Sequence, residues 1–189
     1  FLSWMSRLGL ATDGSANGVT VLKQGWGVEP LTEGQAACVS TMSYNEYWVV
    51  RDAGYTPEQL TVFKYQAEGA STLEDGLYVL EKNLSDDSFK DKMVRFVRAS
   101  MKGWKYAEAN PKEAASIILD NDDAGVQTEK HQIRMMGEIA KLTAGSNGSL
   151  DPSDYERTVK VLMSGASDPV ITKEPSGAWT QDITNAALN

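Results

Sequence analysis

The sequence of 189 residues holds a single cysteine, Cys38, and a single histidine, His131. One cysteine excludes an intramolecular disulfide and a cysteine-based metal cluster, and one histidine excludes the common zinc sites built from several histidines. We therefore expect neither a metal nor an organic cofactor. The apolar neighbours of Cys38 predict a packed, unreactive thiol, and the polar neighbours of His131 predict a solvated side chain.

Positive charge is also scarce, because 18 Lys and Arg residues stand against 26 Asp and Glu, for a formal net charge of -8. No basic stripe interleaved with aromatic residues occurs, so nucleic acid and anionic membranes are poor partners. No apolar run approaches the roughly 18 residues of a membrane-spanning helix, and no signal peptide is recognisable. The hydrophobic fraction of 41% is typical of a soluble globular protein.

Signatures of common enzymes are missing as well. The sequence has no nucleophile elbow, phosphate-binding glycine loop, zinc signature or calcium-binding loop. The acidic run at residues 121–123 lacks the alternating spacing of calcium ligands. The adjacent carboxylates of Glu74 and Asp75 fit a solvated turn better than a catalytic pair. The residue pattern therefore does not indicate catalysis.

What the sequence does contain is a strand, a polar turn and a helix in succession at residues 37–52. Residues 37–39 are short and apolar, as in a buried strand. Ser43 is a candidate N-cap of the helix, and Glu46 follows three residues later, as a capping box requires. In open α/β sheets, ligands bind at the carboxyl ends of strands. This turn is therefore a candidate binding site.

The side chains of the turn suit a small ligand. Tyr44 offers a stacking face, Asn45 an amide and Glu46 a carboxylate. A purely structural interpretation is also open, in which Glu46 closes the helix cap and Tyr44 packs on a neighbouring helix. Trp26, which stands between two glycines, is either a platform for a planar ligand or a plug over the core.

Strand patterns gather near the start of the chain and helical patterns dominate later. We predict strands at residues 19–24, 35–39, 61–65 and 77–80. We predict helices at residues 1–10, 28–34, 44–52, 89–104, 128–143 and 151–164, another that starts at Asn110, and a short one after Trp179. A loop at residues 66–76, rich in glycine and acidic residues, separates two regular stretches. Three or four strands make a thin sheet for so many helices, so sheet partners are missing.

Several short motifs occur in the order and spacing of a known family. They are GWG at residues 25–27, MSYNEYW at 42–48, LEDGLYV at 73–79, FVRA at 96–99, GWKYA at 103–107 and NPKEA at 110–114. Together they resemble the NMT1/THI5-like periplasmic substrate-binding proteins of ABC importers, the thiamine-pyrimidine, nitrate and taurine class. The similarity spans nearly the whole chain, and the N-terminal portion of the family has no counterpart here.

This resemblance implies an α/β fold of the type II periplasmic-binding kind, with two lobes that clamp a ligand. Residues 1–65 form part of the second, ligand-clamping lobe on this interpretation, residues 66–76 a crossover, and residues 77–189 the mostly helical C-terminal part of the first lobe. The N-terminal part of the first lobe is then absent, which accounts for the surplus of helices. A chain that begins without Met is on this view a fragment, a processed product or a trimmed piece.

The resemblance also implies a function without catalysis, as the solute-binding component of a bacterial ABC importer. We expect it in the periplasm or lipid-anchored at the cell surface. The expected partners are a small-molecule ligand and the membrane permease of the importer, with no nucleic acid and no direct insertion into the membrane. The predicted ligand-binding residues are Trp26, Ser43, Tyr44, Asn45, Glu46 and Glu68, and the Tyr-Asn-Glu motif of the family is matched residue for residue.

The class of ligand stays open between several alternatives. A planar nitrogen-containing molecule, such as a thiamine pyrimidine precursor, suits the carboxylate, amide and aromatic ring. A sulfonate, taurine or nitrate suits a helix N-terminus, but Glu46 repels an anion and only Arg51 is nearby. Where many members carry an acidic residue, this chain has Ala36 and Ala37. Two further alternatives are a pyrimidine-synthase-like enzyme, whose histidine and cysteine-rich segment are missing here, and a folded fragment without ligand binding.

Overall fold

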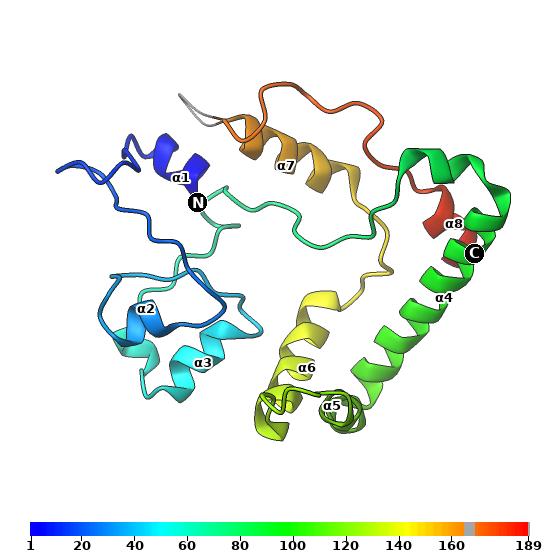
Figure 1. Ribbon diagram of the computed structural model, residues 1–189, viewed down its shortest axis with the longest axis horizontal. Coiled ribbons are helices and arrows are strands. Elements are labelled where there is room, and N and C mark those ends of the chain that lie inside the picture. Colours follow the sequence, from blue (N-terminus) through cyan, green and yellow to red (C-terminus); the bar gives the residue numbers. More distant parts are fainter. Residues whose placement is uncertain (165–168, 189) are drawn as a thin grey trace. The chain divides into compact units, whose positions relative to one another are not determined.

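The computed structural model describes residues 1–164 and 169–188. All regular structure in these ranges is helical (Figure 1). The α-helices are α1 (Leu2–Arg7), α2 (Glu29–Thr32), α3 (Glu46–Asp52), α4 (Asp87–Ala109), α5 (Pro111–Asp120), α6 (Glu129–Thr143), α7 (Pro152–Met163) and α8 (Asp182–Leu188). Two short 3-10 helices, η1 (Pro57–Gln59) and η2 (Glu81–Ser85), lie between them.

The predicted α/β fold of the type II periplasmic-binding kind is wrong for this structure, because its described residues form no sheet. The four segments predicted as strands, at residues 19–24, 35–39, 61–65 and 77–80, are all irregular. A strand persists only where a neighbouring strand satisfies its backbone N–H and C=O groups. No ladder of backbone hydrogen bonds joins these segments, and Phe63 and Tyr78 are 58% and 85% exposed.

The helices, by contrast, begin where the sequence carries local start signals. Thr128 caps α6 by accepting a hydrogen bond from the backbone N–H of His131 at 3.3 Å. Asp151 caps α7 by accepting one from the backbone N–H of Ser153 at 2.8 Å. Pro152 occupies the first turn of α7, where its missing N–H costs no hydrogen bond. Both predicted helix starts are therefore confirmed.

The described chain divides into two compact units, each built from separate stretches. Unit 1 comprises Phe1–Lys23, Thr61–Asp87 and Ser149–Asp182. Unit 2 comprises Gln24–Leu60, Ser88–Gly148 and Ile183–Asn189. The division of the sequence into residues 1–65, 66–76 and 77–189 stays a prediction.

Unit 1 contains two groups of aromatic rings in contact. The ring centroid of Trp4, on α1, lies 5.5 Å from that of Phe63 and 5.8 Å from that of Tyr65. Later in the chain, the ring centroids of Tyr155 and Trp179 lie 5.9 Å apart. The Trp4 contacts attach α1 to the irregular stretch at residues 61–65, and the Tyr155 contact attaches α7 to the irregular stretch before α8. The buried residues of this unit include Ser3, Met5, Ala70 and Val159.

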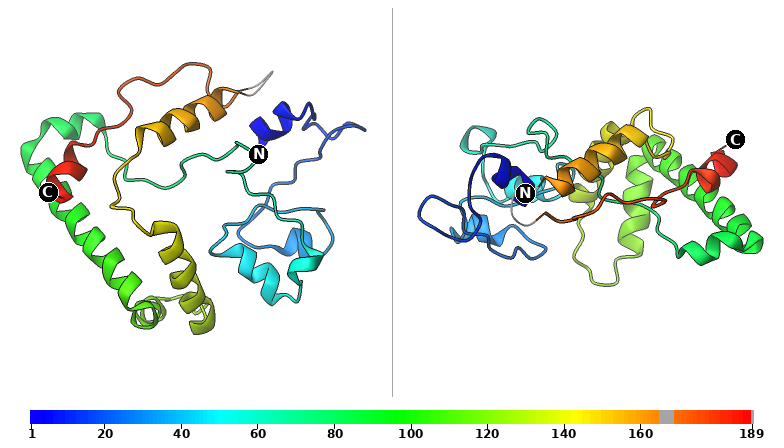
Figure 2. Two further views of the ribbon diagram at one scale, coloured as in Figure 1. Left: turned by 180° about the vertical axis from the view of Figure 1, so that it is seen from behind. Right: turned by 90° about the horizontal axis from the view of Figure 1, so that it is seen from above.

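Unit 2 contains α3, α5, α6 and nearly all of α4. Helix α5 lies beside α6 and packs against it (Figures 1 and 2). Ala115 on α5 is 0% exposed, and Ala114 and Gln132 are also buried. From the middle of α4, Arg98 donates hydrogen bonds to the carbonyls of Ala186 and Ala187 on α8, at 2.9 and 3.0 Å. Small residues between α5 and α6, and the Arg98 side chain between α4 and α8, thus help to hold this unit.

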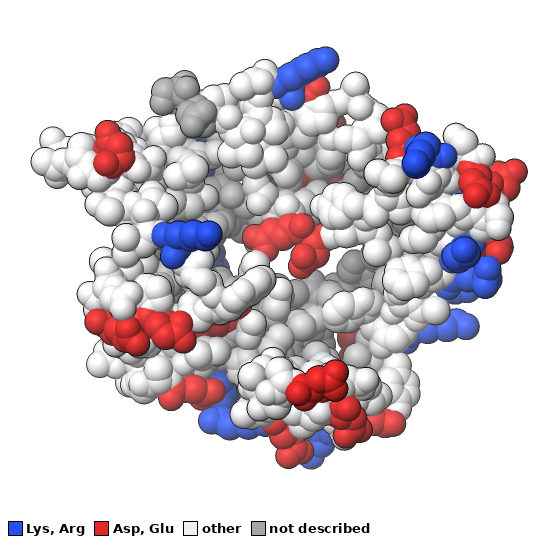
Figure 3. All heavy atoms as spheres, in the orientation of Figure 1, with Lys and Arg blue, Asp and Glu red and all other residues white. Residues whose placement is uncertain are grey.

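The surface carries charges of both signs. On the face drawn in Figure 3, Lys and Arg side chains are scattered among Asp and Glu. None of the described helices has both the length and the apolar character needed to cross a membrane.

Candidate functional site

The candidate site is the turn that leads into α3, which α6 holds through side chains. The Nδ2 atom of Asn45 donates to Oε1 of Glu46 at 2.9 Å, and the Oδ1 atom lies 2.8 Å from Nε2 of His131. The second carboxylate oxygen of Glu46 accepts a hydrogen bond from the backbone N–H of Met42 at 2.8 Å. An ionised carboxylate only accepts, so the amide must present its N–H to Glu46 and its oxygen to His131. The imidazole therefore donates from Nε2.

This network leaves hydrogen-bonding capacity for a ligand. Each carboxylate oxygen of Glu46 has a second lone pair, and the Asn45 amide retains one N–H and one lone pair. Tyr44, Asn45 and Glu46 are all half-buried. Because their neighbours fix their orientation, less conformational freedom is lost on binding. The turn therefore presents an ordered set of acceptors beside one donor.

The start of α3 differs from the predicted capping box. Asn45 occupies the N-cap position, and its side chain makes no cap hydrogen bond. Ser43 lies outside the helix and is exposed. Glu46 does bond back to a preceding backbone N–H, but that group belongs to Met42. The carboxylate thus stabilises the turn as a whole and leaves the side chain of Asn45 for His131.

Charged side chains tie the C-terminal end of α3 to α6. Asp52 accepts hydrogen bonds from Nη1 of Arg134 at 2.8 Å and from Nζ of Lys130 at 3.2 Å. The Arg134 guanidinium lies 4.9 Å from the centroid of the Trp48 ring, in cation-π contact. The hydrogen bond from Arg134, aided by the one from Lys130, lowers the pKa of the Asp52 carboxyl. Asp52 therefore stays ionised and keeps both cations in place.

Two buried donors on α3 lack a partner in the part of the chain that the structure describes. They are Nε1 of Trp48 and Nη1 of Arg51. The two residues are three positions apart and therefore lie on the same face of α3. A buried unsatisfied donor costs about 1–3 kcal/mol. An acceptor group brought to this face would relieve that cost.

The structure places the other predicted residues differently. Trp26 is 100% exposed, which makes it no plug over a core. Its turn is linked to the candidate site, because the Gln24 side chain pairs with the backbone N–H and C=O of Ser40, at 2.9 and 2.8 Å. Glu68 belongs to unit 1, where its backbone carbonyl accepts a hydrogen bond from Arg7 at 2.7 Å. The ligand-binding roles of Trp26 and Glu68 stay predictions.

Two single residues were placed wrongly from the sequence. His131 is half-buried and bonded to Asn45, although its polar neighbours predicted solvation. Cys38 is exposed, because the strand that was to bury it does not form. The Thr128 cap fixes His131 in the first turn of α6, but its partner lies 86 positions earlier. No three His, Cys, Asp or Glu side chains among the described residues form a group suited to a metal ion.

Comparison with known protein families shows the family to which this chain belongs. A family model described as NMT1/THI5 like matches residues 5–114, which is more than half of the sequence. The chain belongs to the NMT1/THI5-like family. The matched range contains the turn before α3 and the start of α5. This family includes substrate-binding proteins of ABC importers. No match was found among curated proteins or among solved structures.

Proposed function

We propose that this chain is the solute-binding component of a bacterial ABC importer and that it recognises a small planar nitrogen-containing ligand. Membership of the NMT1/THI5-like family supports the first part, because its members are mostly substrate-binding proteins. On this proposal the protein performs no catalysis, acts in the periplasm or at the cell surface, and delivers its ligand to the membrane permease. The observation that carries the second part is the fixed Asn45–Glu46 pair.

The Asn45–Glu46 pair is complementary to the edge of an aminopyrimidine. Such an edge offers a donor, the exocyclic amine, next to an acceptor, the ring nitrogen. The free lone pairs of Glu46 accept from the amine, and the free N–H of Asn45 donates to the ring nitrogen. Tyr44, at the preceding position, supplies the ring on which the ligand stacks. A bond to the ionised carboxylate is charge-assisted and contributes most of the affinity.

A sulfonate or nitrate ligand is the second candidate. It is favoured by the two unsatisfied donors of α3, on Trp48 and Arg51, because an oxyanion brings acceptors without donors. The guanidinium of Arg51 also supplies the positive charge that such a ligand requires. The Glu46 carboxylate opposes this choice, since it lies at the N-terminus of the same helix.

Isothermal titration with an aminopyrimidine, taurine and nitrate tests both candidates. Glu46→Gln should weaken aminopyrimidine binding by about 1.5–3 kcal/mol, roughly ten- to a hundredfold in affinity. Glu33→Gln, an exposed carboxylate of unit 2 outside the turn, is the matched control. Arg51→Met should leave aminopyrimidine binding nearly intact and should abolish the binding of an oxyanion.

Three outcomes separate the possibilities. If Glu46→Gln binds the aminopyrimidine with unchanged affinity, Glu46 does not contact the ligand, and its role is to accept the hydrogen bond from the Met42 backbone. Binding of taurine or nitrate that Arg51→Met abolishes would replace the first candidate with the second. No heat of binding for any of the three ligands, by a chain that unfolds cooperatively, would reject both.

A further inference from the structure

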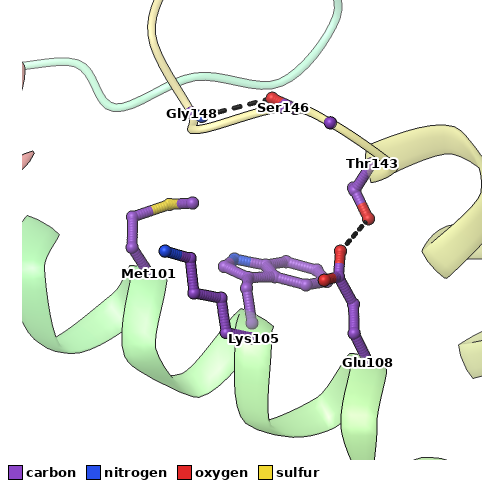
Figure 4. A pocket seen from close by; sticks show the side chains of 8 residues that line it. Met101, Lys105, Glu108, Thr143, Ser146 and Gly148 are labelled. Atoms are coloured by element: carbon purple, nitrogen blue, oxygen red, sulfur yellow. Dashed lines mark hydrogen bonds between the residues drawn. The ribbon is translucent and has the colours of Figure 1, made fainter.

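A hollow lies in unit 2 between α4, the C-terminal end of α6 and the loop that follows α6. It has a volume of about 160 Å³ and opens to solvent. Four lining residues come from α4: Met101, Trp104, Lys105 and Glu108. Their spacing puts them on one face of the helix over two turns. The other walls are the C-terminal end of α6 and the loop at residues 145–148 (Figure 4).

The floor of the hollow is apolar, although no helix covers it. Trp104 is 46% exposed, and Met101 lies half-buried at the opposite end. An engineered apolar cavity of about 150 Å³ holds one benzene molecule, so this hollow has room for a phenyl ring or a branched alkyl group. The apolar part of a ligand can therefore rest on the indole and the thioether.

The two charged residues of this face differ in their partners. Oε1 of Glu108 accepts a hydrogen bond from the hydroxyl of Thr143 at 2.6 Å, which directs the carboxylate to the α6 side of the hollow. Lys105 lies three positions before Glu108 and could pair with it, yet no described residue accepts a hydrogen bond from Lys105 in the structure. Its ammonium group is directed toward the 145–148 loop (Figure 4). One cation and one anion thus stand apart above the apolar floor.

The loop opposite α4 is shaped by glycine. Gly145 and Gly148 have φ values of 78° and 81°, which residues with a side chain rarely adopt. A Cβ atom on Gly148 would lie only 2.8 Å from the sulfur of Met101, so the loop backbone lies directly against the end of the Met101 side chain. The hydroxyl of Ser146 accepts a hydrogen bond from the N–H of Gly148 at 3.2 Å and keeps its own hydrogen for another acceptor.

We propose that this hollow binds a free α-amino acid with an apolar side chain. The carboxylate of the amino acid pairs with the Lys105 ammonium and accepts from the Ser146 hydroxyl. Its ammonium group pairs with Glu108, and its side chain lies on Trp104 and Met101. A zwitterion satisfies both charges at once, whereas a simple anion meets repulsion from Glu108 and a simple cation meets repulsion from Lys105.

Titration with L-phenylalanine, followed by the indole N–H signals in nitrogen-15 NMR, tests the proposal. Trp104→Phe assigns the Trp104 signal among those of the five tryptophans. L-Phenylalanine should shift that signal more than the other four. 3-Phenylpropionate, which lacks the ammonium group, and 2-phenylethylamine, which lacks the carboxylate, should each bind more weakly by up to about fivefold, as expected for loss of one exposed ion pair of up to about 1 kcal/mol.

Matched variants separate this site from general effects on the helix. Lys105→Met should weaken L-phenylalanine binding about fivefold. Lys102→Met, which changes an exposed lysine of α4 that does not line the hollow, should leave binding unchanged. Gly148→Ala should also weaken binding, because the added methyl displaces the Met101 thioether from the floor of the hollow and alanine is strained at a φ of 81°. Circular dichroism establishes that each variant keeps its helices.

The proposal fails if L-phenylalanine leaves the Trp104 signal unmoved. It also fails if both lysine variants lose affinity equally, or if the two analogues bind as tightly as the amino acid. None of the lining residues belongs to the turn at residues 42–46, so Glu46→Gln should not affect this binding. The result of the L-phenylalanine titration is therefore independent of the result for a ligand at the turn before α3.

Discussion

The contacts that join distant segments differ in kind between the two units. In unit 1, the ring of Trp4 packs against Phe63 and Tyr65. In unit 2, polar side chains join α3 to α6, with Asp52 bonded to Arg134 and Asn45 bonded to His131. Aromatic packing responds little to pH or salt. Exposed charge pairs are weakened when low pH protonates the carboxylate and when added salt screens the charges. We therefore expect unit 1 to depend on single rings and unit 2 to depend on solution conditions.

Removal of the Trp4 ring should have a large effect on the stability of unit 1. Trp4→Ala deletes the contacts with Phe63 and Tyr65, and also an edge contact with Phe1 whose ring centroid lies 6.5 Å away. Truncation of a fully buried aromatic side chain costs roughly 3–5 kcal/mol, and Trp4 is half-buried, so we expect a loss of about 2 kcal/mol. Hydrogen exchange should show the loss of protection in unit 1.

The matched control for this variant is Trp179→Ala, which removes the ring contact with Tyr155 and leaves Trp4 in place. Its effect should be smaller, since Trp179 is 41% exposed. Equal loss of protection in both units after Trp4→Ala would contradict the view that the ring acts within unit 1.

Unit 2 should be most sensitive to added volume between its helices. Ala115 on α5 is 0% exposed, so Ala115→Leu forces three extra carbon atoms into a filled space. Overpacking of this kind costs about 1–3 kcal/mol, which a urea melt can measure. Ser116→Leu, at the next and exposed position of α5, is the control and should change stability by less than about 0.5 kcal/mol. A larger effect at Ser116 than at Ala115 would contradict the packing of α5 in the structure.

Some of the contacts behind these expectations can be predicted from the sequence, and others cannot. Helices α6 and α7 could be predicted because their signals are local: Thr128 and Asp151 act on residues two or three positions away. The segment at residues 61–65 has the β-branched and aromatic composition of a strand, but no composition supplies the neighbour that a strand requires. Its Phe63 packs on Trp4 instead.

The candidate site shows the same limit. The Tyr-Asn-Glu turn could be found from its motif and from its position before a helix. The residue that anchors this turn could not be found in the same way, since His131 bonds to Asn45 from 86 positions later in the chain, on another helix. The unpartnered donors of Trp48 and Arg51 were equally hidden, because burial depends on tertiary structure. Motifs locate such a site, whereas the residues that orient it emerge only from the fold.

The smallest effect concerns the charge of Asp52 and depends on pH. The hydrogen bond from Arg134 lowers the pKa of this carboxyl below its usual value of 3.8. A carboxyl whose pKa is lower in the folded state adds stability above the unfolded-state pKa, and this contribution is lost as the pH falls through the folded-state pKa. Since the side chain of Asp52 is 40% exposed, the contribution should be less than about 1 kcal/mol.

Asp52→Asn should therefore lower the free energy of unfolding slightly at pH 7 and leave it unchanged near pH 2, in urea melts at low salt. Salt should narrow the difference at pH 7, because the pair with Arg134 is partly exposed. Asp91→Asn is the control, since Asp91 pairs with Arg95 within α4 and joins no two helices. Hydrogen exchange should show the effect of Asp52→Asn in α3 and α6, with unit 1 unaffected. If the free energy of unfolding of Asp52→Asn depends on pH in the same way as that of the unmodified protein, the Asp52–Arg134 ion pair is not the source of pH sensitivity in unit 2.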